Sequence, residues 1–241
     1  MRILSDYTPA RVQLGTAGGS LPTNPLLDLR LAHARAQDAV HFPLDSFSLV
    51  QEMAQRNWDS RVIRSSAKNR DEYLHMPDRG RMLDDASASE VARFVKCCSV
   101  ALVVADGLSA LAVHRHAVPL LQEAFQRGLE LDEVGCIWIV HQGRVAVGDH
   151  IAELLQPELS IVIIGERPGL STPDSLGIYL TWEPRLGRKD SERNCISNIH
   201  GHGLSYRYAA DKLVFLITEA RRRRLSGVLL KDLSAKQLTE E

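Results

Sequence analysis

The chain has 241 residues, enough for one large domain or two modest ones around a substantial hydrophobic core. Hydrophobic residues make up 44% of the chain and the formal net charge is -1, which argues against a protein that binds nucleic acid or an anionic membrane through basic residues. No apolar stretch approaches the roughly 18 residues needed to cross a bilayer, and the first residues lack a secretory segment, so we expect a cytoplasmic protein.

The first part of the chain, residues 1–89, is polar and interrupted, and it predicts a mainly helical region. Asn24 and Pro25 favour a helix start, because Asn can cap a helix and Pro suits its first position. This helix is expected to continue to about Val40. Proline and glycine within residues 76–80 then indicate a turn.

From residue 90 to residue 241 short apolar runs alternate with helical stretches. The expected strands are 99–104, 136–140, 160–164 and 177–182, and the expected helices lie at about 107–127, 149–155 and 206–224. Pro119 is expected to split or kink the first of these helices. Strands separated by helices favour parallel pairing, so the sequence predicts an α/β fold with an open, doubly wound parallel sheet.

Ligands of such sheets bind beyond the carboxyl ends of the strands, and three of these ends carry polar turns. The turns are 106–109, 141–145 and 165–169. The third places Glu166 and Arg167 directly after a buried strand, in a turn fixed by glycine and proline. On its own, such a turn favours a role in closing the fold over a role in ligand binding.

Other motifs give weaker signals. The glycines of residues 15–20 lack the spacing of a phosphate loop, and no histidine falls in an HExxH pattern. Cys97, Cys98 and Cys136 have no zinc-site spacing and are expected to be reduced, buried thiols. The fourth cysteine, Cys195, precedes His200 by five residues, which raises the hypothesis of a Cys-His hydrolase, although no hydrolase signature accompanies the pair.

Six segments, in their order along the chain, resemble the small subunit of ethanolamine ammonia-lyase. They cover residues 11–18, 26–40, 69–81, 105–109, 164–170 and 194–200, and the last two, Ile-Gly-Glu-Arg-Pro-Gly-Leu and Asn-Cys-Ile-Ser-Asn-Ile-His, are the most specific. Each segment alone is a weak signal. The ordered set spans nearly the whole chain.

The resemblance implies an adenosylcobalamin-dependent lyase that converts ethanolamine into acetaldehyde and ammonia. This chain would be its small subunit, with a Rossmann-like domain in residues 90–241, and would form a hetero-oligomer with a large barrel subunit that carries the catalytic residues. Cofactor contacts carry over to Val145, Glu166 and Cys195. The chain has no Asp-x-His-x-x-Gly segment, so no protein ligand to cobalt is expected here.

Two alternatives accompany this interpretation. The chain could be a non-catalytic scaffold module that binds a partner through a Rossmann-like fold. Some family members also carry a longer N-terminal extension, of a kind that can direct enzymes into a bacterial microcompartment, so that compartment is the alternative location.

Overall fold

The computed structural model describes residues 11–12, 14–94 and 98–232 of the chain. The α-helices are α1 (Thr23–His41), α2 (Ser46–Ala54), α3 (Arg70–His75), α4 (Asp85–Ala92), α5 (Ala110–Gln126), α6 (Leu131–Val134), α7 (Val147–Leu155) and α8 (Tyr206–Arg223). The strands are β1 (Ser60–Arg64), β2 (Val100–Ala105), β3 (Ile137–His141), β4 (Leu159–Gly165), β5 (Leu176–Trp182) and β6 (Arg193–Ile199). Short 3-10 turns lie at η2 (Arg79–Arg81), η3 (Asp190–Glu192) and η4 (Gly227–Leu229).

The six strands form one sheet in the order β1-β3-β2-β4-β5-β6, which confirms the α/β class. The first four strands pair in parallel, but β5 and β6 are antiparallel to their neighbours, so the expectation of parallel pairing is wrong for 177–182. The reason is the connection after β4. Only ten residues without a helix separate Gly165 from Leu176, which is shorter than a typical crossover between parallel strands.

The sequence did not indicate the two edge strands, β1 and β6. Strand β1 lies in the first 89 residues and pairs with β3 of the second part, so one sheet draws on both predicted regions. The proposed division into 1–89 and 90–241 stays a prediction.

Two predicted helices differ from expectation in detail. Helix α1 begins at Thr23 with Pro22 as its N-cap, so Asn24 lies in the first turn and caps nothing. Helix α5 runs unbroken from Ala110 to Gln126 with Pro119 inside it, so the predicted split is wrong. Its buried face, which includes Leu120, packs on the sheet and holds the helix together across the proline.

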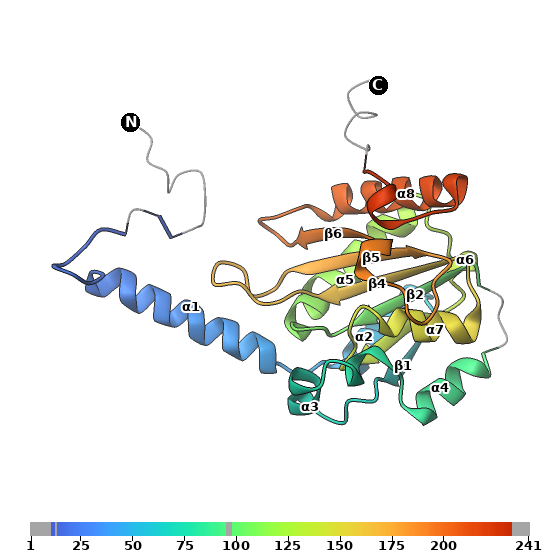
Figure 1. Cartoon of the computed structure of the whole chain (residues 1–241), viewed down its shortest axis with the longest axis horizontal. Coiled ribbons are helices and arrows are strands. Elements are labelled where there is room, and N and C mark those ends of the chain that lie inside the picture. The colour runs from blue at the N-terminus through green and yellow to red at the C-terminus, as the bar shows by residue number, and fades with distance from the viewer. Residues whose placement is uncertain (1–10, 13, 95–97, 233–241) are drawn as a thin grey trace, which may run out of the picture.

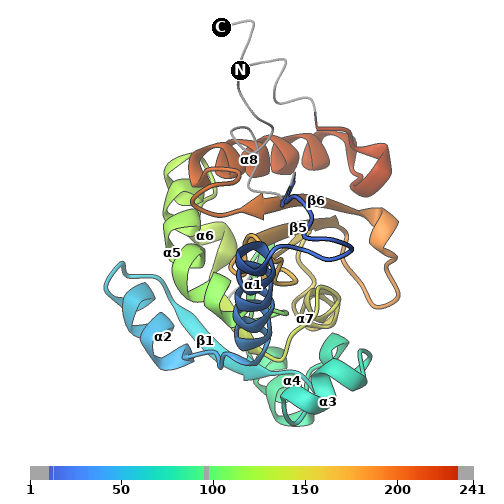
Figure 2. The same ribbon diagram turned by 90° about the vertical axis from the view of Figure 1, so that its left-hand side faces the viewer.

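Helices cover the two faces of the sheet unequally (Figures 1 and 2). Helices α5 and α8 cover one face, onto which Leu102, Ile161 and Ile178 point. On the other face α7 packs over β2 and β4. No described helix packs closely across β5 and β6 on that side, so Tyr179 is half-buried and Cys195 is exposed. This half of the sheet face is open.

Helix α1 projects away from the body, beyond the end of the sheet at which the loop between β4 and β5 lies (Figure 1). Only Ala32 and Ala39 of its 19 residues are buried. Of the helices that the structure describes, none is both long and apolar enough to span a membrane.

Candidate functional site

The turn after β4 packs directly on the turn after β2. Leu108 N–H donates to the carbonyl oxygen of Gly165 at 2.9 Å, and a Cβ on Gly165 would lie 2.1 Å from the carbonyl oxygen of Ser109. A side chain at position 165 is therefore impossible without moving the backbone. This close approach brings two of the three predicted strand-end turns together and fixes the position of Glu166.

Glu166 is held by one of its two carboxylate oxygens. The Ser175 hydroxyl donates to Oε2 at 2.5 Å, and the backbone N–H of Asn198 donates to the same oxygen at 3.2 Å. Oε1 accepts no hydrogen bond from the residues that the structure describes. The side chain therefore has a fixed position and one oxygen available to a ligand.

A β-bulge in β6 supplies the second of these donors. Ile178 faces Ile196 and Leu176 faces Ile199, so three residues of β6 span the distance of two in β5. Asn198 lies in this extra stretch with a φ of 63°, and its N–H points to Glu166 instead of to the neighbouring strand. Bulges often redirect groups beside functional sites in this way.

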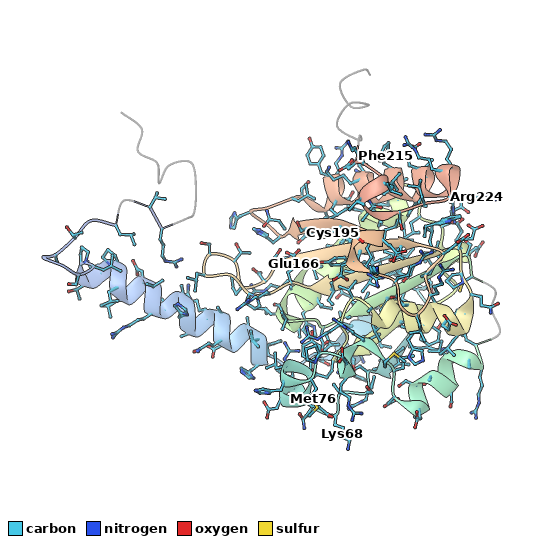
Figure 3. The ribbon with its side chains drawn as sticks, in the orientation of Figure 1. Lys68, Met76, Glu166, Cys195, Phe215 and Arg224 are labelled. Atoms are coloured by element: carbon cyan, nitrogen blue, oxygen red, sulfur yellow. The ribbon has the colours of Figure 1, made fainter. Side chains whose placement is uncertain are left out.

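Cys195 lies directly opposite Tyr179 across the β5–β6 pair, and the two side chains are hydrogen-bonded. Desolvation raises the pKa of the Cys195 thiol, the Tyr179 hydrogen bond lowers it, and the negative charge of Glu166 raises it further. The net pKa is above the ordinary thiol value. The thiol is therefore protonated near neutral pH. Figure 3 shows Cys195 and Glu166 at the same end of the sheet.

The turn after β3 is held by Asp106 at the end of β2. Its buried carboxylate accepts the backbone N–H groups of Gln142 and Gly143 at 2.8 and 3.0 Å. Burial raises the pKa of Asp106 to about 6, although these two hydrogen bonds and the positive charge of Arg70 lower it. The carboxylate thus fixes the segment that leads to Val145 and α7.

Two adjoining cavities open beside these turns. The Glu166 cavity, of about 430 Å³, is lined by Tyr73, Gly107, Leu108, Arg144, Val145, Ile164, Gly165, Glu166, Arg167 and Tyr179. The Lys189 cavity, of about 600 Å³, is lined by Arg81, Met82, Arg144, Val145, Ala146, Asp149, Leu186, Gly187, Arg188, Lys189, Asp190 and Arg193. Arg144 and Val145 belong to both. Of the predicted cofactor contacts, Val145 and Glu166 line the Glu166 cavity. Cys195 is connected to this cavity through the hydrogen bond of its thiol with Tyr179, which is part of the lining.

The sequence did not predict one part of this wall. Tyr73 of α3 lies between two guanidinium groups, with Arg70 4.7 Å and Arg144 4.6 Å from its ring centre. Arg70 also donates to the carbonyl oxygen of Gly107 at 2.7 Å, which ties α3 to the turn after β2. The segment 69–81 was singled out only by resemblance, and nothing in its own pattern indicates contact with residues some seventy positions away.

Cys195 and His200 do not form an activated pair in the described structure. His200 Nε2 bonds to the side-chain oxygen of Asn198 at 2.9 Å, and His200 Nδ1 accepts the N–H of His202 at 3.2 Å. With its pKa raised, Cys195 lacks the thiolate that nucleophilic catalysis requires. Cys98 and Cys136 are buried, as expected, and Cys97 lies outside the described residues.

Comparison with known proteins gives concordant results. The family model of the ethanolamine ammonia-lyase light chain (EutC) matches residues 1–231. The ethanolamine ammonia-lyase small subunit of Pseudomonas aeruginosa strain UCBPP-PA14 is 50% identical over 242 residues, which cover 98% of this chain and 89% of the relative. The small subunit of Pseudomonas putida strain W619 is 48% identical over 235 residues, which cover 95% of this chain and 86% of the relative.

Proposed function

The chain belongs to the ethanolamine ammonia-lyase light-chain family, and we propose that, as the small subunit of such a lyase, it forms one wall of an adenosylcobalamin site that the large subunit completes. The observation that carries this proposal is the convergence of Val145, Glu166 and the Tyr179–Cys195 pair around one cavity. This cavity lies at the carboxyl ends of the parallel strands, where open α/β sheets bind their ligands.

The residues of this wall fit a corrin, which is a broad ring with amide groups around its rim. Oε1 of Glu166 can accept a hydrogen bond from such an amide, and as part of a charged group it would bind more firmly than a neutral acceptor. Gly177 leaves space beneath it, because a Cβ there would lie 2.9 Å from Oε1. Two adjoining cavities also suit a flat, extended ligand better than either cavity alone.

Adenosylcobalamin, when bound, supplies the radical chemistry that converts ethanolamine into acetaldehyde and ammonia. The chain's own residues bind and orient the cofactor and exclude water. Glu166 fixes the orientation of the ring through its amides, and Val145 provides an apolar contact. The protonated Cys195 thiol and the Tyr179 hydroxyl line the remaining open face of the sheet. Catalytic residues are assigned to the large subunit.

The open side of the cavity requires a second polypeptide, because a cofactor bound there would otherwise stay exposed to water. Helix α1 projects past the same end of the sheet and exposes 55% of Leu27 and 50% of Leu31. We infer that the large subunit closes the cavity and covers this side of α1.

The test is reconstitution with the purified large subunit, followed by titration with adenosylcobalamin and assay of acetaldehyde. Glu166→Gln should weaken cofactor affinity by about 1–3 kcal/mol, because a charge-assisted hydrogen bond is replaced by a weaker one. The control, Glu130→Gln, changes an exposed carboxylate at the start of α6 that caps no helix through its side chain and should leave affinity unchanged.

Three outcomes separate the alternatives. No gain in acetaldehyde over the large subunit alone would contradict a role in the lyase. Unchanged cofactor affinity in Glu166→Gln would remove Glu166 from the site. Tight binding of the large subunit, with turnover and affinity both insensitive to Glu166, would favour the scaffold alternative.

A further inference from the structure

We propose that the Lys189 cavity binds the phosphodiester of the cofactor's nucleotide tail, with Arg144 and Lys189 as its cationic contacts. This inference rests on the proposed function and extends it to the second cavity. The two cavities share Arg144 and Val145 in their linings, so a ligand whose ring occupies the Glu166 cavity has the Lys189 cavity as its immediate neighbour.

The lining of the Lys189 cavity is strongly basic. Five of its residues are arginine or lysine and two are aspartate. The Arg193 guanidinium and the Asp149 carboxylate neutralise each other in a buried bidentate pair at 2.6 and 2.8 Å. Arg188 forms a partly exposed ion pair with Glu192, with Nη1 2.5 Å from Oε1. Once these two pairs are set aside, the cations Arg81, Arg144 and Lys189 remain in the lining with one carboxylate, Asp190, so the cavity has an excess of positive charge.

Arg144 is the better placed of the remaining cations. Its Nη2 donates to the carbonyl oxygen of Tyr73 at 3.0 Å, yet its Nε is buried without a hydrogen-bond partner, and it forms no ion pair within the described part of the chain. Its backbone N–H donates to the Gly80 carbonyl oxygen at 2.8 Å, and a Cβ on Gly80 would lie 2.9 Å from its Cγ. The guanidinium is therefore positioned before any ligand arrives.

Lys189 brings a second charge from the loop between β5 and β6. It is exposed and, among the residues with described structure, forms no ion pair. Arg81, also in the lining, pairs with Asp78, whose side chain is 92% exposed, and such an exposed pair contributes little. A planar guanidinium and a flexible ammonium suit the oxygens of a phosphate.

The positive charge of the Lys189 cavity indicates which part of the cofactor binds there. The amides at the rim of a corrin are neutral, whereas the phosphodiester of the nucleotide tail is anionic. An anion-binding cavity that adjoins the ring cavity is therefore assigned to that tail.

The experiment compares two corrinoids on the reconstituted complex with the large subunit. Cobalamin carries the nucleotide tail, and cobinamide lacks both the nucleotide and the phosphodiester. Equilibrium dialysis with visible absorbance gives the affinity of each. Arg144→Gln and Lys189→Gln should each weaken cobalamin binding by about tenfold or more, the loss expected for one charge-assisted contact. Lys189→Gln should leave cobinamide binding unchanged, and Arg144→Gln, whose side chain also lines the Glu166 cavity, should weaken cobinamide binding less than cobalamin binding.

Two further variants and a competitor sharpen the result. Arg144→Lys keeps the charge and should recover part of the lost affinity, and Arg207→Gln, at an exposed arginine on α8, should change neither affinity. Inorganic phosphate should compete with cobalamin but not with cobinamide. Lys189 is exposed and outside the core, so its variant tests the proposal even if Arg144→Gln fails to fold.

Equal losses for both corrinoids, or no loss for either, would overturn the inference and leave the proposed function intact. A complex that binds neither corrinoid would refute the proposed function, and this inference with it.

Discussion

Gly177 lies beneath Glu166 in β5, and its missing side chain leaves room for the carboxylate. A Cβ at this position would lie 2.9 Å from Oε1 and 3.3 Å from Cγ of Glu166. These atoms belong to a flexible side chain, so Glu166 can move while the strand stays in place. We predict that Gly177→Ala lowers cobalamin affinity by about 1 kcal/mol, the scale of one misplaced hydrogen bond, with little change in the free energy of unfolding.

The matched control is Gly201→Ala, because a Cβ there meets no atom within 4 Å. Cofactor titration of the complex and urea unfolding of the small subunit measure the two quantities separately. Equal affinity losses in the two variants, or a large loss of stability in Gly177→Ala, would contradict this account of the glycine.

The Cys195 thiol gives a second residue-scale prediction, which depends on pH. Because its pKa is raised, the fraction of reactive thiolate is small at pH 7–8, and the rate of iodoacetamide labelling should still be rising above the ordinary thiol pKa of about 8.5. Tyr179→Phe removes a hydrogen bond that lowers this pKa, so the variant should be labelled more slowly at each pH below the midpoint.

Labelling of Cys195→Ser measures the background from the other cysteines, of which Cys98 and Cys136 are buried. A midpoint well below the ordinary value would indicate an activated thiol and would restore the hydrolase hypothesis.

At the scale of elements, one buried ion pair joins β6 to α7. The side chains of Arg193 and Asp149 are 2% and 3% exposed, and Arg193 also donates to the carbonyl oxygen of Arg188 at 3.0 Å. Replacing the arginine alone leaves a buried, unpaired carboxylate. We therefore predict that Arg193→Met lowers the free energy of unfolding by about 3–5 kcal/mol, measured by urea denaturation.

The control removes both charges. Arg193→Met combined with Asp149→Leu should recover much of the loss, because no unpaired charge then remains in the interior. A single variant as stable as the original chain would show that the pair does not hold these elements together.

The strands differ in how well the sequence predicts them, for a physical reason. All residues of β2 and β4 are buried, and such apolar runs are visible in the sequence. β1 lies at the edge of the sheet and buries only Ile63, so its sequence, Ser-Arg-Val-Ile-Arg, gives no such signal. β6, the other edge strand, alternates poorly because of its bulge. The antiparallel direction of β5 depends on the short, helix-free loop after β4, and the apolar patterns of the strands do not reveal the conformation of that loop.

The residues of the candidate site also differ in how well the sequence predicts them, according to whether they follow a buried strand or lie in an edge strand. Val145 and Glu166 follow buried strands, so strand-end reasoning located their turns. Cys195 lies in the edge strand β6, and only the family resemblance singled it out. The stacking of Tyr73 between Arg70 and Arg144 joins residues far apart in the sequence, and tertiary packing alone brings them together.

At the scale of the whole molecule, the Glu166 turn and α1 lie at the same end of the sheet (Figures 1 and 3), whereas the Lys189 cavity reaches toward the loop between β5 and β6, which follows the other end of β5. Helix α1 buries little of its surface against its own chain, so intramolecular packing alone accounts poorly for a helix of this length. A partner that closes the Glu166 cavity would also lie within reach of Leu27 and Leu31. The fold of the small subunit is thus suited to a composite site, in which the small and large subunits together enclose the cofactor.

This arrangement predicts that Leu27→Glu combined with Leu31→Glu weakens association with the large subunit. Burying each leucine at an interface contributes about 1.5–3 kcal/mol to the free energy of binding. The double variant should therefore bind the large subunit at least about tenfold more weakly, as measured by analytical ultracentrifugation or surface plasmon resonance. Its free energy of unfolding should change little, because both side chains are already exposed in the isolated chain.

The matched control changes Val228 and Leu229 to glutamate. These side chains are 71% and 74% exposed in η4, which packs near the start of β6, at the opposite end of the sheet from the Glu166 turn. A partner that covers the Glu166 cavity and α1 lies at the other end of the sheet from η4, so this control should associate normally. If both double variants bind the large subunit as tightly as the original chain, α1 is not part of the interface and the composite site must be closed from another side.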